Sequence, residues 1–88
     1  MRSLILYTRA GCCLCEGLEE RLRDLRPADP PRRVDVDSDP ALQARYGLSV
    51  PVLAVADGAS GTITPLPPVP PRLKGESLRA WLHRHIGA

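Results

Sequence analysis

The stretch that decides the fold is Leu4-Ile5-Leu6-Tyr7-Thr8-Arg9-Ala10-Gly11-Cys12-Cys13-Leu14-Cys15, close to the start of the 88-residue chain. Its first half is apolar, which predicts a β-strand over residues 2–8. After the cysteines, apolar residues recur at helical spacing, which predicts a helix over residues 13–26. This helix should pack one stripe of leucines against the core, namely Leu14, Leu18, Leu22 and Leu25.

Cys12 and Cys15 form a Cys-x-x-Cys pair where the strand leads into the helix. Such a pair at a strand-to-helix junction is typical of thiol–disulfide redox sites. The beginning of a helix offers unpaired N–H groups and a partial positive charge, and both favour a thiolate over a thiol. Because the thiolate is the reactive form of cysteine, the motif predicts redox chemistry.

The position of each cysteine on the helix predicts its role. Cys12 precedes the first turn, so we expect it to be the accessible nucleophile with a low pKa. Cys15 lies about 50° from the centre of the leucine stripe, which places it at the edge of the core as the resolving thiol. Cys13 points about 150° away and should face solvent. Arg9, three residues before Cys12, would add positive potential at the thiolate.

The next part of the chain predicts a second strand and a short helix. Prolines after residue 26 end the first helix, and alternation over residues 33–37 predicts a strand. Strand, helix and strand over this length predict a parallel βαβ unit. A short helix should follow over residues 40–46, capped by Ser38 or Asp39.

The last part of the chain predicts a hairpin and a final helix. Residues 50–56 are almost all apolar, which predicts a third strand buried on both faces. A turn and a fourth strand over residues 62–64 would complete an antiparallel hairpin. The proline-rich residues 65–71 favour a stiff, extended connector beside the cysteines. The last helix should begin after Gly75, with Trp81 in its core face.

Composition limits the classes of function. Hydrophobic residues make up 43% of the chain and charged residues 25%, so we expect one globular domain over residues 1–88, acting as a monomer. The net charge of +2 is spread over interleaved acidic and basic residues, which argues against nucleic-acid binding. No apolar stretch is long enough to span a membrane, and the first residues lack the pattern of a signal peptide, so the expected location is cytoplasmic.

Two alternative functions stay open. The cysteines could hold zinc or an Fe–S cluster in a binding module without turnover. Zinc needs four ligands, however, and the other candidates are Cys13 and the distant His83 and His85, so we expect no metal site. The segment Pro67-x-x-Pro70-x-Arg72 fits a polyproline docking motif, which would make the chain an adaptor.

Two segments resemble the glutaredoxins. Tyr7-Thr8-Arg9-Ala10-Gly11-Cys12-Cys13-Leu14-Cys15 resembles the strand-end pattern of that family, Tyr-Thr/Ser-Lys/Arg-x-x-Cys-Pro-Tyr-Cys, with Cys13-Leu14 in place of Pro-Tyr. Tyr46-Gly47-Leu48-Ser49-Val50-Pro51-Val52 resembles the segment that carries a cis-proline in the thioredoxin superfamily. The chain is most similar to short bacterial glutaredoxin-like proteins with Cys-x-Leu-Cys. The resemblance implies a thioredoxin-like α/β fold, with a four-stranded mixed sheet flanked by helices on both faces.

The resemblance also implies how the chain acts. Cys12 would attack a disulfide and Cys15 would resolve the mixed disulfide, as in a thiol–disulfide oxidoreductase of electron transport and cell redox homeostasis. Protein or low-molecular-weight disulfides would be the substrates. Glutathione would be a candidate reductant, and no cofactor would be required.

The binding residues that the resemblance implies surround these cysteines. Pro51 would be cis, and Val50 would offer backbone groups to a bound peptide or glutathione. Arg9 would help to bind the same substrate. Gly75 lies where the family has Gly-Gly-x-Asp, which holds a glutathione carboxylate. Here the segment is Leu73-Lys74-Gly75-Glu76-Ser77, so the match supports the redox chemistry better than it supports glutathione as the partner.

Overall fold

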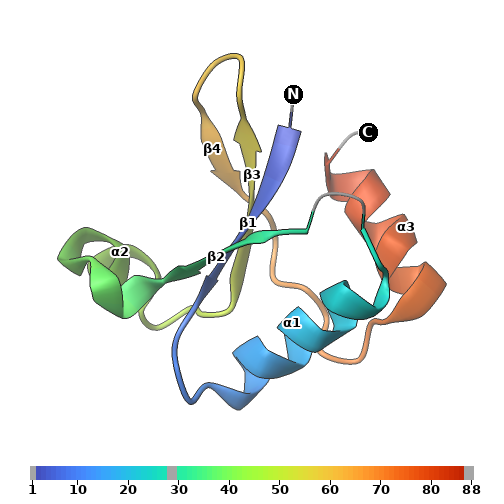
Figure 1. The fold of residues 1–88 in the computed structure, drawn as a ribbon, viewed down its shortest axis with the longest axis horizontal. Coiled ribbons are helices and arrows are strands. Elements are labelled where there is room, and N and C mark those ends of the chain that lie inside the picture. The colour runs from blue at the N-terminus through green and yellow to red at the C-terminus, as the bar shows by residue number, and fades with distance from the viewer. Residues whose placement is uncertain (1, 28–29, 87–88) are drawn as a thin grey trace.

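The computed structural model describes residues 2–27 and 30–86, which form a mixed sheet and its helices (Figure 1). The strands follow the order β2-β1-β3-β4 across the sheet. Along the chain the elements are β1 (Arg2–Thr8), α1 (Cys13–Asp24), β2 (Arg32–Asp35), the 3-10 turn η1 (Val36–Ser38), α2 (Pro40–Tyr46), β3 (Val52–Asp57), β4 (Ile63–Pro65) and α3 (Gly75–Ile86).

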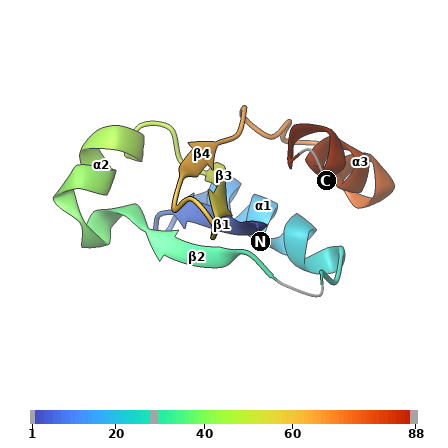
Figure 2. The same cartoon turned by 90° about the horizontal axis from the view of Figure 1, so that it is seen from above.

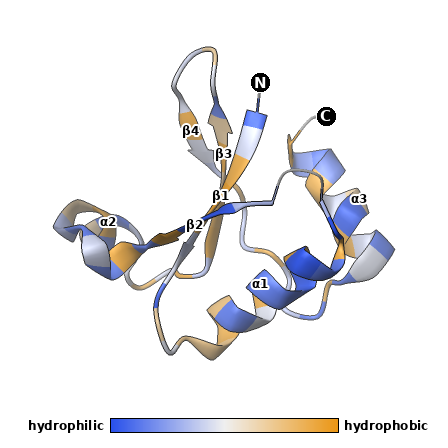
Figure 3. Ribbon diagram, in the orientation of Figure 1, coloured by the Kyte–Doolittle hydropathy of each residue, from blue (hydrophilic) through white to orange (hydrophobic). Residues whose placement is uncertain are grey.

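The pairing of the strands confirms the predicted topology. β1 pairs in parallel with β2, as expected for the βαβ unit, and antiparallel with β3. β3 and β4 form the predicted antiparallel hairpin. β1 therefore lies inside the sheet, which agrees with its change from polar to apolar residues along its length (Figure 3). Its C-terminal end leads directly to the cysteines.

One core cluster lies between the sheet and the helices α1 and α3. Leu6 of β1 and Leu53 of β3, which are register partners, face this side. The helices contribute the remaining buried members, which are Leu18, Leu22, Leu78, Trp81 and Leu82. The predicted core position of Trp81 is therefore confirmed.

A second cluster covers the opposite face of the sheet. Ile5 and Tyr7 alternate with Leu6 along β1, so they point to the other side. Tyr7 stacks on Tyr46 at the end of α2, with ring centroids 4.6 Å apart. In Figures 1 and 2, α2 and α3 lie at opposite sides of the sheet. The two clusters confirm the predicted arrangement of helices on both faces.

The short helix α2 forms where the sequence predicts it. The Asp39 carboxylate caps its start by accepting a hydrogen bond from the Ala41 N–H at 2.9 Å. Pro40 occupies the first turn, where a missing N–H costs nothing. Gly47 follows as the C-cap.

The predicted core position of Leu14 is wrong. Its side chain is 64% exposed, whereas Leu18, one turn later, is 1% exposed. Cys15 of the same first turn is 0% exposed, so the buried face of α1 consists of Cys15, Leu18 and Leu22, and Leu14 lies beside that face.

Three element boundaries differ from the predictions by two residues. The first helix ends at Asp24, and Arg26 takes a positive φ of 51° before the prolines. The second strand ends at Asp35, because its carboxylate accepts the N–H of Asp37 and turns the chain into η1. The third strand begins only at Val52. Its second half is half-buried rather than buried, because it pairs with the exposed beginning of β1.

The proline-rich connector lies along α1 and is held by Arg21, a residue that sequence alone places on the solvent face. The Arg21 guanidinium donates to the carbonyls of Pro70 at 3.1 Å and Leu73 at 2.5 Å, and also to Gly17 within α1. The side chains of Leu66 and Val69 pack on the first core cluster. Within the described residues, no helix has the length and apolarity needed to cross a bilayer.

Leu14→Ala and Leu18→Ala form a matched pair at successive turns of α1. Leu18→Ala should lower the free energy of unfolding by about 2–5 kcal/mol, because it opens a cavity in the core. Leu14→Ala should change it by no more than about 0.5 kcal/mol. Urea denaturation of both variants measures the difference, and equal losses would contradict the exposed position of Leu14.

Arg21→Met should lower the free energy of unfolding by about 1–3 kcal/mol, because part-buried carbonyls of the connector lose their donor. Arg23→Met is the control, since the Arg23 side chain is 72% exposed and makes only a 3.8 Å ion pair with Glu19. Thermal and urea denaturation compare the two. A control as unstable as Arg21→Met would refute a bracing role for Arg21.

Candidate redox site

A short turn joins β1 to α1 and brings Cys12 to the start of the helix. The Cys12 N–H donates to the Arg9 carbonyl at 3.3 Å, and Gly11 takes a φ of 78°. A side chain at this φ would be strained, so glycine suits the position. Cys12 is the N-cap residue of α1, with extended backbone angles.

The Cys12 thiol is placed to ionise readily. Its Sγ accepts a hydrogen bond from the Cys15 N–H at 3.3 Å, as an N-cap side chain does. The pKa of Cys12 lies below its ordinary value, first because the Cys15 thiol can donate to it. The N–H groups of Cys15 and Leu14 lower this pKa further, and the charge of Arg9 adds a weaker effect. The predicted low pKa of Cys12 therefore has a local cause.

The Cys15 thiol lies in the opposite environment. Its side chain is 0% exposed, deeper than the core edge that the sequence predicts. Burial raises the pKa of Cys15, and the neighbouring Cys12 raises it further, although hydrogen bonding from Thr8 and the Arg9 N–H acts against this. Cys13 is exposed, as predicted. One thiol of the pair is thus partly exposed with a lowered pKa, and the other is buried with a raised pKa.

The Val50–Pro51 peptide bond is cis, as the resemblance implies. The Val50 N–H donates to the Tyr46 carbonyl at 3.1 Å, within the loop that follows α2. The Val50 N–H is therefore used inside the chain. A binding role for the backbone of Val50 stays a prediction.

A groove of about 220 Å³ lies between α1, the loop before β3 and the proline-rich connector. Its apolar lining comes from Leu14 and Leu18, Val50 and Pro51, and Val69 and Pro71. The connector lies opposite α1 in this groove, whose lining includes Leu14 of the first turn, and its predicted position beside the cysteines stays a prediction. Leu48, in the same loop as Val50, is fully exposed. The exposed side chain of Leu14 forms part of the lining of this groove.

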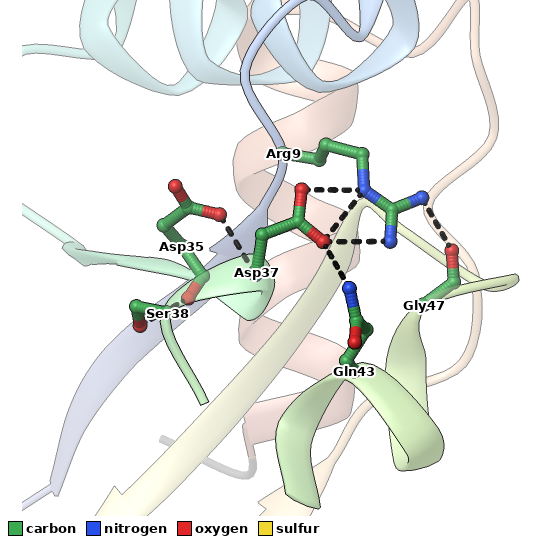
Figure 4. A network of polar contacts seen from close by, with 6 residues as sticks. All are labelled: Arg9, Asp35, Asp37, Ser38, Gln43 and Gly47. Atoms are coloured by element: carbon green, nitrogen blue, oxygen red, sulfur yellow. Dashed lines mark hydrogen bonds and ion pairs between the residues drawn. The ribbon is translucent and has the colours of Figure 1, made fainter. Parts of the chain in front are cut away.

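Arg9 is held in a polar network (Figure 4). Its Nε lies 3.0 and 3.2 Å from the two Asp37 carboxylate oxygens, and Nη2 donates to one of them at 3.0 Å. Nη1 donates to the Gly47 carbonyl at 3.0 Å, and Gln43 donates to Asp37 at 2.9 Å. The Arg9 guanidinium holds the pKa of Asp37 below its usual range, and Gln43 contributes.

Asp37 and Arg21 are the site residues that sequence reasoning missed. Asp37 lies 28 residues from Arg9, and in the sequence it reads as one of several acidic residues at a strand end. Arg21 lines the groove from a helix position that looks solvated. Neither contact has a local sequence signal.

Comparisons with known proteins agree with the observed fold. Residues 3–83 match the family model described as glutaredoxin-like domain (DUF836). The chain belongs to this family. The X-ray structure of the Northeast Structural Genomics target protein XcR50 from X. campestris is similar to this glutaredoxin-like domain with a TM-score of 0.63 and 38% identity, over 93% of this chain and 97% of that one.

The solution structure of XcR50 gives a TM-score of 0.61 and 35% identity, over 93% of this chain and 94% of that one. No protein with a curated description matches significantly. The sheet order, the flanking helices and these similarities together show the thioredoxin-like α/β fold that the resemblance implies.

Gly75 is the first residue of α3 in this glutaredoxin-like domain and has a φ of 58°. It is exposed and does not line the groove. The preceding Leu73 contacts Arg21, well along α1 from the cysteines. A role for Gly75 in binding glutathione stays a prediction.

The described residues contain no group of three or more cysteine, histidine, aspartate or glutamate side chains suited to a metal. His83 and His85 are exposed on α3, where His85 lies against Trp81 with ring centroids 4.3 Å apart. A metal or Fe–S cluster held by Cys12 and Cys15 would need ligands beyond those that the described residues bring together.

The opposite pKa shifts predict an order of alkylation. Because the thiolate is the reacting form, modification of Cys12 should be half-maximal at a pH below about 8.5, the ordinary pKa of a free thiol. Cys15 should react last, since its pKa is raised and its side chain is buried. Iodoacetamide labelling across pH 5–10, with mapping by mass spectrometry, measures both. A Cys12 midpoint at or above about 8.5 would contradict the geometry.

Proposed function

We propose that this glutaredoxin-like domain is a thiol–disulfide oxidoreductase with Cys12 as the nucleophile and Cys15 as the resolving thiol. One observation carries the proposal. The accessible Cys12 Sγ accepts the Cys15 N–H at the start of α1, while the Cys15 side chain is fully buried one turn into the helix. This arrangement favours attack by the first thiol and protects the second until it is needed.

In the first step, the Cys12 thiolate attacks one sulfur of a substrate disulfide. A bond forms between the Cys12 Sγ and that sulfur, the substrate S–S bond breaks, and the second substrate sulfur leaves as a thiolate that takes up a proton. The hydrogen bonds that lower the pKa of Cys12 increase the fraction of thiolate at a given pH.

In the second step, Cys15 loses its proton and its sulfur attacks the Cys12 Sγ. The Cys12–substrate bond breaks and the remaining substrate thiolate leaves. The chain now carries a Cys12–Cys15 disulfide, and the substrate has gained two electrons and two protons. The raised pKa of Cys15 falls once Cys12 no longer carries charge, because the Cys12 charge is one of its causes.

Completion of the cycle needs an external thiol, for which glutathione is a candidate. The two cysteines supply both electrons, so the proposed chemistry requires no cofactor. Protein or low-molecular-weight disulfides would bind beside Pro51, with an N–H of an extended segment donating to the Val50 carbonyl. A reducing compartment such as the cytoplasm suits a domain that must be returned to its dithiol form.

Serine variants of the three cysteines test the proposal. Cys15→Ser should accumulate a stable mixed disulfide on Cys12, because nothing resolves it, and lose at least about 90% of the dithiol activity toward a protein disulfide. Cys12→Ser should form no mixed disulfide. Cys13→Ser is the matched control and should retain activity. Intact-mass measurement after exposure to glutathione disulfide reads out each species.

Two results would overturn the proposal. One is a mixed disulfide on Cys13 rather than Cys12, and the other is a wild-type protein that never forms the Cys12–Cys15 disulfide. Metal analysis of the purified wild-type protein distinguishes the alternative. Zinc or iron near one equivalent per chain or per dimer, lost in Cys12→Ser, would favour the metal-binding module.

A further inference from the structure

The cation nearest to the reactive thiol along the chain is already paired. Arg9 lies three residues before Cys12, and its charge favours the Cys12 thiolate. Its guanidinium uses Nε and Nη2 for Asp37 and Nη1 for the Gly47 carbonyl. The edge of the guanidinium that best recognises a carboxylate is therefore occupied by a carboxylate of the same chain.

Asp37 is held in this position by a second donor and by the turn in which it lies. Gln43 donates to the same Asp37 oxygen that Arg9 contacts (Figure 4). Asp37 also lies in the turn that the Asp35 carboxylate stabilises by accepting the Asp37 N–H. An incoming carboxylate would have to displace Asp37 from Arg9 and lie close to its negative charge. Near Cys12, the pair presents little net charge to a substrate.

The groove along α1 adds a second observation, because its lining includes Leu14, two residues after Cys12. Its lining is apolar apart from Ser49 and Arg21. The Arg21 guanidinium is committed to the carbonyls of Pro70 and Leu73. Leu14 adds an exposed apolar surface at the mouth. The groove is therefore complementary to uncharged, apolar groups.

We propose that Asp37 determines substrate preference at the Cys12 site by neutralising Arg9, so that disulfides with uncharged, apolar flanking groups react in preference to disulfides that carry carboxylates. The inference rests on the proposed function and names its substrate class. It changes the expected role of Arg9, which would position the turn before Cys12 through Asp37 and Gly47 instead of binding substrate. Asp37 is a specificity-determining residue that never contacts the reacting sulfurs.

The test compares two small disulfides in the Cys15→Ser background, where the first step stops at the mixed disulfide. Glutathione disulfide carries carboxylates, and bis(2-hydroxyethyl) disulfide is uncharged. Asp37→Asn should raise the ratio of the two rate constants, glutathione over hydroxyethyl, by about threefold to tenfold at low salt. The gain should shrink at high salt, because screening weakens attraction to an exposed Arg9.

Asp39→Asn is the matched control. It removes one negative charge from the same segment, and asparagine still caps α2. Its rate ratio should equal that of the parent, and adding Arg9→Gln to Asp37→Asn should abolish the gain. Asp37→Ser serves as a second variant if Asp37→Asn folds poorly, which thermal unfolding shows.

The outcomes separate the two proposals. If the parent forms a Cys12 mixed disulfide with both probes but Asp37→Asn and Asp37→Ser change the ratio no more than Asp39→Asn, the role of Asp37 is refuted and the redox function stands. If Cys12 reacts with neither probe, the proposed function fails and this inference fails with it.

Discussion

The hydrogen bond from the Cys15 N–H to the Cys12 Sγ is the interaction on which the site depends. It exists because Cys15 does two things at once. Its side chain is buried against the end of β1, which fixes the first turn of α1, and its amide points back to the N-cap position. Packing of the helix thereby sets the electrostatics of the thiol. A helix that slid by one residue would lose both the core contact and the donor.

Much of the fold follows from local sequence signals. The alternation of Ile5, Leu6 and Tyr7 sets two faces for the central strand, and the capping pattern at Asp39 sets the start of α2. The cysteine geometry was predictable for the same reason, because the spacing of a helix determines which of three neighbouring cysteines is buried. These signals act within one or two turns of the chain.

The parts that sequence could not supply depend on distant residues. Leu14 satisfies the helical period of its neighbours, but the tertiary packing of α1 buries the face of Cys15, Leu18 and Leu22 and leaves Leu14 beside it. Arg9 and Asp37 meet across 28 residues, and Arg21 and Leu73 across 52. An arginine in a polar stretch gives no indication of whether its partner is water, a carboxylate or a backbone carbonyl. The apolar run predicts a third strand that begins two residues too early, because such a run does not reveal where hydrogen bonding to β1 begins.

The two edges of the sheet have a consequence for encounters with other chains. β4 has three residues and ends at Pro65, which has no N–H, and β2 has four residues with charged side chains at Arg32, Arg33 and Asp35. Short edges of this kind offer few free backbone groups to a neighbouring strand, which protects against edge-to-edge aggregation. Neither edge of the sheet is thus well suited to being lengthened by a strand from another chain.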